Sequence, residues 1–318
     1  MRTASIALAL TLAAPALAQS VHALDGTHET RSNDFEGRAL WIQYTGGAGA
    51  TRFATVIRLN DYYGLTAAHV ARGIKNGTTP TVGTGSNYNT DPGITRSVID
   101  WDTHPTWNGS FDGTAVDLAW VRFDEPLPGP PGFETETIRG IGLDVDLSFV
   151  GFGRPATPGT GLLPFDGGRR AFDAVTDDHG NAGLGVSTDY SRCDFLTLAQ
   201  RNLPLAGIGT DGNSGSPGFK DLDSSLALMV VATAGSPSYG GSTYALRLKR
   251  YEDWIIANTT PPETCDPDVN GDGVLDNGDI SAFVVLFLAG DLAADFTGDG
   301  ILDNGDIGAF VTAFLAGC

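Results

Sequence analysis

Short runs of apolar residues, broken at regular intervals by glycine, proline, asparagine and aspartate, fill residues 39–258. The clearest runs are ALWIQY, ATVIRL, DLAWVRF, LSFVGFG and LALMVVATAG, which are rich in valine, isoleucine, phenylalanine and tryptophan. Regularly spaced short strands with turn residues between them are typical of an antiparallel sandwich or barrel. No alternation of strands with amphipathic helices is visible, so we predict a mainly β fold for this region.

The spacing becomes helical near the end of this region. In LKRYEDWIIAN the residues Leu248, Tyr251, Trp254 and Ile255 recur at helical intervals, which predicts a terminal helix packed on the β body. A polar segment with two prolines follows, and we interpret residues 259–264 as an extended linker.

Residues 265–318 contain an internal repeat with an offset of 27 residues. DVNGDGVLDNGDISAFVVLFLAG begins at Asp268, and DFTGDGILDNGDIGAFVTAFLAG begins at Asp295. Each copy joins an acidic loop to an apolar stripe at helical spacing, which a solvated acidic tail would not carry. We therefore predict a small α-helical domain built from a duplicated loop and helix. The two stripes are Ile280, Phe283, Val284, Phe287 and Leu288, and Ile307, Phe310, Val311, Phe314 and Leu315.

The repeated loops have the spacing of a calcium loop. Oxygen-bearing side chains stand at positions 1, 3, 5, 9 and 12, glycine stands at position 6, and a backbone carbonyl is available at position 7. Hard oxygen ligands at this density suit Ca²⁺, and two ions are expected. The predicted ligands are Asp268, Asn270, Asp272, Val274, Asp276 and Asp279 in the first loop, and Asp295, Thr297, Asp299, Ile301, Asp303 and Asp306 in the second.

The N-terminus has the features of a secretory signal peptide. Arg2 precedes an apolar run, and Ala16-Leu17-Ala18 has the small-x-small form of a cleavage site, so residues 1–18 are expected to direct secretion to an extracytoplasmic compartment. The run is too short to span a bilayer stably, and no later segment is long and apolar enough. Residues 19–38 are polar, and we expect a propeptide or a flexible N-terminus there.

The net charge limits the kinds of partner, and the cysteine content limits the disulfides that can form. The net charge of −19 argues against nucleic acid as a partner and against docking on an anionic bilayer. An exported chain can keep disulfides, and three cysteines allow one bridge and one leftover thiol. Cys265 and Cys318 bracket the repeat and are the predicted pair, which leaves Cys193 as the odd thiol.

The stretch TDGNSGSP places Ser214 between two glycines, where a serine is either part of a turn or a nucleophile. A base is available at His69 in LTAAHVA. Asp117 opens the apolar run DLAWVRF, where a buried carboxylate is costly unless it is paired, and Asp112 is the weaker candidate. The order His69, Asp117, Ser214 differs from the orders of the α/β-hydrolases and the subtilisins.

In TAAH, DLA and GNSGSP the chain resembles the trypsin/chymotrypsin-like serine endopeptidases over residues 39–258, and the form GNSGSP resembles their bacterial glutamyl-endopeptidase branch. The resemblance implies two six-stranded antiparallel barrels with the triad at their junction. It also implies an oxyanion hole formed by the backbone N–H groups of Gly212 and Ser214. In trypsin an aspartate before the serine pairs with a freed N-terminus, whereas Asn213 stands here, and Val70 replaces the family's cysteine after the histidine.

The same resemblance places four residues at the primary substrate pocket: Ile208, Ala232, Thr233 and Gly235. Glutamate-specific relatives have a histidine where Ala232 aligns. Without a cationic partner a buried substrate carboxylate would lack compensation. We therefore expect a neutral or apolar substrate side chain.

The repeat in residues 265–318 resembles a type I dockerin. Such modules typically bind cohesin domains through loop positions 10 and 11, so the resemblance implies a cohesin-like or cell-surface partner. Those positions are Asn277-Gly278 and Asn304-Gly305, which offer little side chain and leave open a calcium-stabilised spacer. A Cys265–Cys318 bridge would clasp the ends of the module.

Two functions follow as hypotheses. The first is a secreted serine endopeptidase that acts on protein or peptide substrates without a catalytic cofactor and carries a calcium-dependent anchoring module. The alternative is a catalytically silent pseudoprotease that serves as a binding or display protein.

Overall fold

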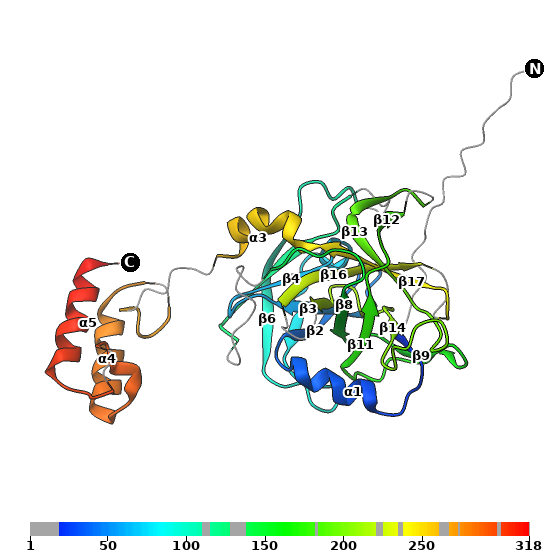
Figure 1. The fold of residues 1–318 in the computed structure, drawn as a ribbon. Coiled ribbons are helices and arrows are strands. Elements are labelled where there is room, and N and C mark those ends of the chain that lie inside the picture. Colours follow the sequence, from blue (N-terminus) through cyan, green and yellow to red (C-terminus); the bar gives the residue numbers. More distant parts are fainter. Residues whose placement is uncertain are drawn as a thin grey trace, which may run out of the picture. The chain divides into compact units, whose positions relative to one another are not determined.

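The computed structural model describes residues 19–109, 115–127, 138–181, 184–220, 225–234, 238–260, 267–272, 274–297 and 300–317 (Figure 1). The chain divides into two compact units, residues 1–260 and residues 261–318. Within the described part of the chain, no helix has the length and apolarity needed to cross a bilayer. The predicted mainly β fold class is confirmed in the first unit.

The first half of the large unit is a closed barrel with strand order β2-β3-β4-β7-β6-β5. The apolar runs ALWIQY, ATVIRL and DLAWVRF form three of its strands, and residues such as Leu40, Val56 and Val121 are fully buried in the core. Closure satisfies the backbone groups of every strand edge. The strands are β2 (Ala39–Thr45), β3 (Thr51–Arg58), β4 (Tyr63–Thr66), β5 (Thr81–Gly83), β6 (Thr95–Thr103) and β7 (Ala119–Phe123).

The second half is a seven-stranded antiparallel sheet that curls into a half-barrel, with strand order β11-β8-β15-β16-β17-β13-β12. Among the described residues its outer strands β11 and β12 do not pair with each other, so this second barrel of the predicted fold is open at that edge. The strands are β8 (Asp146–Gly151), β11 (Arg170–Val175), β12 (Asp178–Asn181), β13 (Val186–Asp194), β15 (Pro217–Lys220), β16 (Ser225–Ala234) and β17 (Ser242–Arg247).

Elements of residues 19–38, where we expect a propeptide or a flexible N-terminus, pack on the rest of the large unit. Phe35 is buried and stacks on Phe219 with ring centroids 4.6 Å apart, and the buried His28 places Nδ1 2.7 Å from the carbonyl oxygen of Ala171. Strand β1 joins a small sheet of order β10-β9-β1-β14. These elements are β1 (Gln19–Val21), α1 (Thr27–Ser32), η1 (Asn33–Phe35), β9 (Pro155–Thr157), β10 (Gly161–Leu162) and β14 (Gly207–Ile208).

The predicted terminal helix is present as a short 3₁₀ turn, η4 (Leu248–Tyr251), followed by α3 (Glu252–Thr259). Leu248 and Ile255 are fully buried on the apolar face that the spacing predicted. A further short helix, α2 (Ala68–Gly73), follows β4 in the closed barrel.

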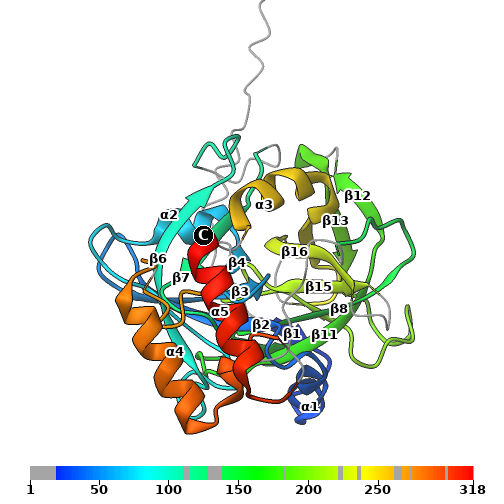
Figure 2. The same cartoon turned by 90° about the vertical axis from the view of Figure 1, so that its left-hand side faces the viewer.

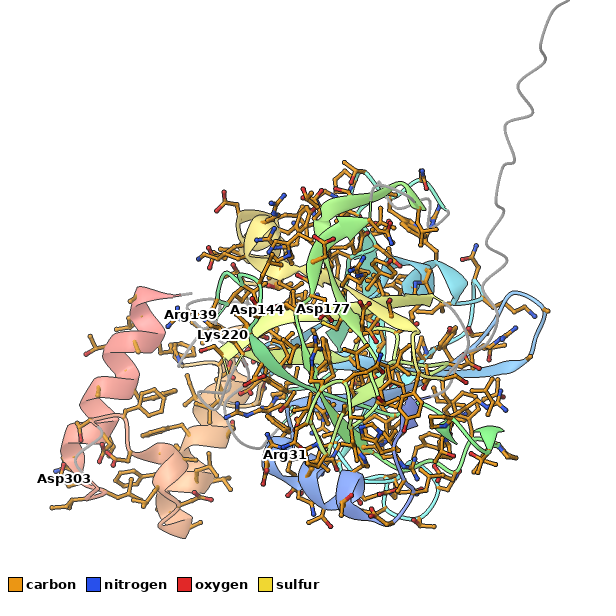
Figure 3. The ribbon with its side chains drawn as sticks, turned by 45° about the vertical axis from the view of Figure 1, so that its right-hand side comes forward. Arg31, Arg139, Asp144, Asp177, Lys220 and Asp303 are labelled. Atoms are coloured by element: carbon orange, nitrogen blue, oxygen red, sulfur yellow. The ribbon has the colours of Figure 1, made fainter. Side chains whose placement is uncertain are left out.

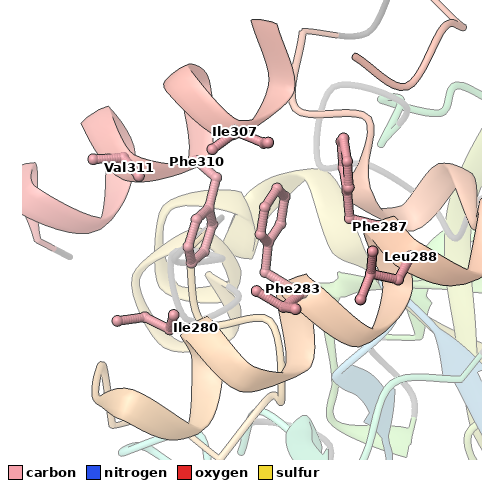
Figure 4. A pocket seen from close by; sticks show the side chains of 8 residues that line it. Ile280, Phe283, Phe287, Leu288, Ile307, Phe310 and Val311 are labelled. Atoms are coloured by element: carbon pink, nitrogen blue, oxygen red, sulfur yellow. The ribbon is translucent and has the colours of Figure 1, made fainter. Parts of the chain in front are cut away.

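The small unit consists of α4 (Asn277–Ala289), η5 (Leu292–Ala294) and α5 (Asn304–Ala316), with α4 and α5 side by side (Figure 2). Phe283 and Phe310 stack with ring centroids 4.1 Å apart, and Phe296 packs edge-on against both rings. A groove of about 300 Å³ runs between the helices, and Leu288 on its rim is 80% exposed (Figure 4).

Candidate active site

Two neighbouring strands of the closed barrel bring His69 and Asp117 together. Thr66 at the end of β4 pairs with Ala119 at the start of β7, so the residues just beyond these two positions are adjacent. The fully buried Asp117 accepts the backbone N–H of His69 at 2.8 Å through Oδ1. Its Oδ2 lies 2.7 Å from Nδ1 of the same histidine. Because a carboxylate only accepts, Nδ1 carries the ring proton in this arrangement.

Ser214 completes a continuous line of hydrogen bonds. Its Oγ lies 2.7 Å from Nε2 of His69. Since Asp117 holds the proton on Nδ1, Nε2 is left free to accept from the serine hydroxyl. The three residues that the sequence analysis selected are therefore within hydrogen-bond distance of one another, in the order that a nucleophile, a base and a base-orienting carboxylate require. Asp112, the weaker alternative to Asp117, lies outside the described residues.

Strand β3 of the closed barrel and strand β16 of the open sheet hold the nucleophile loop between them. The backbone N–H of Thr55 donates to the carbonyl oxygen of Ser214 at 2.9 Å, and the N–H of Gly215 donates to that of Val230 at 2.8 Å. Gly215 has φ +88°, and a Cβ there would lie 2.0 Å from the Thr55 oxygen. Only glycine fits this approach, which explains the residue after the nucleophile.

The oxyanion-hole prediction concerns the backbone N–H groups of Gly212 and Ser214. Within the part of the chain that the structure describes, neither group donates to a protein acceptor. The carbonyl oxygen of Gly212 accepts from Thr55 Oγ1 at 2.8 Å, which fixes the peptide that follows. Gly212 has φ +95°, and a Cβ there would lie 2.6 Å from the Phe152 oxygen. Two unpaired donors beside a nucleophile are what a developing oxyanion requires.

Asn213 lies fully buried inside the nucleophile loop and is held by a neutral network. Its Oδ1 accepts from Thr210 Oγ1 at 2.8 Å, and its Nδ2 donates to Ser216 Oγ at 3.2 Å. A Cβ on Gly153 would lie 2.0 Å from Oδ1, so the glycine makes room for the amide. The loop is therefore positioned without the buried ion pair that an aspartate would require.

Asp211 supplies a second negative charge near His69. Partial burial of the imidazole opposes its protonation, but the charge and hydrogen bond of Asp117, with a further contribution from Asp211, raise the pKa of His69 above its ordinary value. Burial also raises the pKa of Asp211, although Arg154, Arg52 and His69 oppose the shift. The imidazole is 38% exposed, so it remains accessible to a substrate.

Sequence reasoning missed several residues that support the site. Asp211 lies inside TDGNSGSP, but the sequence analysis assigned it no role. Thr55 and Tyr190 lie far from this motif in the chain. Tyr190 accepts the backbone N–H of Asp117 at 3.2 Å, and its own hydroxyl donates to the carbonyl oxygen of Ala115. Burial and nearby negative charge raise the pKa of Tyr190, although the hydrogen bond from the Asp117 N–H opposes the shift. Only the motif position of Asp211 offered a signal in the sequence.

Of the four residues predicted to line the substrate pocket, the described part of the chain includes Ile208, Ala232 and Thr233. Ile208 is buried in a small cluster with Phe195 and Ala206. Ala232 and Thr233 lie in β16, paired with Tyr244 and Thr243 of β17. Gly235 lies outside the described residues.

In the small unit, two of the predicted loop ligands cap the helices: Asp276 caps α4, and Asp303, which Figure 3 labels, caps α5. Asp279 is fully buried and accepts the N–H groups of Asp276 at 2.9 Å and Asn270 at 3.2 Å, which hold its pKa below the ordinary value. Asp306 repeats the pattern with Asp303 and Thr297 at 2.8 and 3.0 Å. Among the described residues no three acidic, histidine or cysteine side chains are gathered as a ready-made metal site. Besides Asp279 and Asp306, the predicted loop ligands that the structure describes are Asp268, Asn270, Asp272, Val274 and Asp276, and Asp295, Thr297, Ile301 and Asp303.

The remaining sequence predictions concern residues 1–18, Asp299, Cys265 and Cys318, all outside the described residues. The Cys265–Cys318 bridge therefore stays a prediction. Cys193 is a buried free thiol, and burial raises its pKa.

No protein-family profile and no curated protein matches the chain. Solved structures do match. The HL collagenase structure is 16% identical and covers 70% of this chain and 94% of its own, with a TM-score of 0.53. The scabies mite inactivated protease paralogue S-I1 is 14% identical and covers 71% and 96%, also with a TM-score of 0.53. The large unit therefore has the fold of the chymotrypsin-like serine proteases.

Proposed function

We propose that the protein is a serine endopeptidase that uses Ser214, His69 and Asp117. The observation that carries the proposal is the unbroken line from Ser214 Oγ through His69 to Asp117, with both contacts at 2.7 Å. The fold of the structural neighbours supports a protein or peptide substrate. No cationic side chain stands at Ile208 or Ala232, which supports a neutral or apolar side chain on the acyl side of the cleaved bond.

In this mechanism His69 Nε2 takes the proton of Ser214 as Oγ attacks the peptide carbonyl carbon. Asp117 stabilises the imidazolium that forms and keeps its proton on Nδ1. The N–H groups of Gly212 and Ser214 donate to the oxygen that becomes negative. His69 then gives its proton to the leaving amine, the C–N bond breaks, and water releases the acyl group by the same steps.

The rival hypothesis is a pseudoprotease, and one structural neighbour is itself described as an inactivated protease paralogue. The intact triad and the two free hole donors favour an enzyme here. A fluorophosphonate probe, which reacts only with an activated serine, distinguishes the two. We expect one label per chain on Ser214, and absence of labelling in the folded protein would leave the binding hypothesis standing.

We further propose that residues 1–18 direct secretion and that the small unit binds two calcium ions. The fit rests on the donor set, because the loops offer carboxylate, amide, hydroxyl and carbonyl oxygens together with the buried Asp279 and Asp306. The proposed ligands are the twelve loop residues named above. Residues 265–318 hold ten aspartates and no lysine or arginine, so calcium would relieve their repulsion and couple to folding.

The proposal also concerns whether the small unit binds a partner. Asn277-Gly278 and Asn304-Gly305 present little side chain at the positions through which dockerins bind cohesins. This composition favours a calcium-stabilised spacer over a cohesin-binding module. Calorimetric titration with Ca²⁺ tests the metal, and a pull-down with and without chelator tests a cell-surface partner.

A further inference from the structure

The two repeated loops of the small unit are a matched pair that differs in very few places. The first loop, DVNGDGVLDNGD, covers residues 268–279, and the second loop, DFTGDGILDNGD, covers residues 295–306. They differ at positions 2, 3 and 7, and position 7 offers its backbone carbonyl oxygen whatever its side chain. Among the proposed side-chain ligands only position 3 therefore differs, with Asn270 in the first loop and Thr297 in the second.

The side-chain oxygen of Asn270 can become a ligand without giving up a hydrogen bond. Its Oδ1 accepts the backbone N–H of Asp272 at 2.9 Å, and its Nδ2 donates to Asp272 Oδ2 at 3.1 Å. An amide oxygen has two lone pairs, so one remains for a cation. Amide carbonyl and carboxylate oxygens are the side-chain ligands that Ca²⁺ ordinarily takes. The first loop thus has a suitable donor at position 3.

The hydroxyl group of Thr297 is used as a donor inside the second loop. Its Oγ1 lies 3.0 Å from Oδ1 of Asp306 and 3.3 Å from Oδ1 of Asp295. Because a carboxylate only accepts, the hydroxyl proton is directed at these proposed ligands. The oxygen of threonine is also attached directly to Cβ, so it reaches less far from the backbone than the oxygen of asparagine. The second loop therefore has the weaker and shorter donor at position 3.

Position 2 connects the second loop to the core of the small unit. Phe296 stands between the proposed ligands Asp295 and Thr297, and its ring centroid lies 5.5 Å from that of Phe283 on α4 and 5.3 Å from that of Phe310 on α5. The rings of Phe283 and Phe310 stack on each other between the helices (Figure 4). The first loop has a valine at this position. Fixing the backbone of the second loop on both sides of Phe296 also fixes the ring that touches both helices.

We propose that the two loops bind calcium in a fixed order, the first loop tightly and the second loop, weakened by Thr297, only at higher calcium concentration. Filling of the second loop then completes the aromatic core through Phe296. The proposal rests on the proposed binding of two calcium ions. Each loop holds four aspartates, so the difference does not come from charge. Ligand set and rigidity tune such loops over several orders of magnitude, and we expect their affinities to differ by at least about tenfold.

The test is a calorimetric titration of the full chain with Ca²⁺, from which the heat measured with a chain of residues 1–260 is subtracted. We expect two steps with dissociation constants at least about tenfold apart. Thr297→Asn should bring the constants together by tightening the weaker one, and Asn270→Thr should do so by weakening the tighter one. Thr312→Asn is the matched control, because it changes an exposed threonine on α5 outside both loops and should leave both steps unchanged.

Nuclear magnetic resonance of the isotope-labelled full chain assigns each step to a loop. The backbone N–H groups of Gly278 and Gly305 each donate at 2.6 Å to the aspartate that caps their helix, so their amide signals report the first and the second loop. The Gly278 signal should change at the lower calcium concentration. The Gly305 signal and the ring signals of Phe296 should change together at the higher one.

Exchange of the two residues in one variant, Asn270→Thr with Thr297→Asn, should reverse the order in which the amide signals change. Equal constants in wild type, earlier filling of the second loop, or an unchanged order in the exchanged variant would overturn the ordered binding alone. Absence of any calcium step in the folded full chain would overturn the proposed calcium sites as well.

Discussion

The backbone N–H of Thr55 donates to the carbonyl oxygen of Ser214 at 2.9 Å, which joins the closed barrel to the nucleophile loop of the open sheet. His69 and Asp117 belong to the closed barrel, so this hydrogen bond fixes the serine relative to its base. Thr66 Oγ1 donates to the Thr55 carbonyl oxygen at 2.9 Å and holds the same strand from the other side. The geometry of the triad thus depends on both halves of the large unit.

Ser214→Ala should abolish peptide hydrolysis, because no other group near His69 Nε2 can attack the carbonyl carbon. Loss of a nucleophilic serine in a triad costs roughly 10⁶-fold in kcat. The circular dichroism spectrum should stay that of the wild type. Ser281→Ala changes an exposed serine of the small unit and should keep full turnover. Wild-type turnover in Ser214→Ala would show that the triad assignment is wrong.

The acid limb of the pH profile should report His69. The base must be neutral to accept the serine proton, and Asp117 raises the pKa of His69 above the ordinary 6.5. The imidazole therefore stays protonated to a higher pH than a free histidine, and kcat/KM should fall with a midpoint above 6.5 as the pH is lowered. A midpoint at or below that value would contradict the described electrostatics.

Asp211→Asn should move that acid limb to lower pH. The carboxylate of Asp211 is one of the groups that raise the pKa of His69, so its neutral amide should let the base lose its proton earlier. Asp253→Asn on α3 neutralises an exposed carboxylate that does not contribute to this shift. The comparison requires kcat/KM profiles of both variants, and an equal displacement in the two would point to a general charge effect.

Gly153→Ala should lower both stability and activity. Its Cβ would meet Asn213 Oδ1 at 2.0 Å and Thr210 Oγ1 at 2.4 Å, so the network beneath the nucleophile has to shift. Overpacking of this kind costs about 1–3 kcal/mol. Gly140→Ala is the matched control, since no atom lies within 4 Å of its Cβ position. We expect Gly153→Ala to show a lower unfolding temperature and a lower kcat than Gly140→Ala.

Asp279→Asn in the full chain should reduce the number of bound calcium ions from two to one. The residue closes its loop, and its buried carboxylate also accepts the N–H of Asp276. Calorimetric titration measures the stoichiometry, and chelator should lower the helical signal of the isolated segment 265–318. Asp291→Asn alters an exposed aspartate outside both loops and should retain two ions. Retention of two ions by Asp279→Asn would exclude its role as a ligand.

Deletion of residues 261–318 should leave peptide hydrolysis unchanged. The described triad and its supporting residues all lie within residues 1–260, which form a compact unit of their own. The measurement is kcat/KM of the truncated enzyme on one peptide. A substantial loss would show that the small unit takes part in catalysis or in the stability of the large unit.

Most of the fold could be predicted because short apolar runs, separated by turn residues, form the strands of the closed barrel. The triad could be predicted because each of its motifs is local in the sequence. The N-terminal segment escaped prediction for a physical reason. His28 donates a hydrogen bond to the backbone of Ala171, and Phe35 stacks on Phe219. Neither contact produces a periodic pattern of apolar residues in the sequence. The contacts of Phe53 on β3 with Tyr88 and Phe165 could not be predicted either, since those two rings lie in loops whose paths depend on tertiary packing.

The neutral network around Asn213 has a consequence at the alkaline end of the pH range. An aspartate held by an α-ammonium group loses its partner as the amine deprotonates, which occurs at about pH 8 for an unperturbed terminus. The amide of Asn213 and the hydroxyls of Thr210 and Ser216 have no proton to lose there. The nucleophile loop should therefore keep its shape in alkaline solution and need no newly cleaved chain end to reach it.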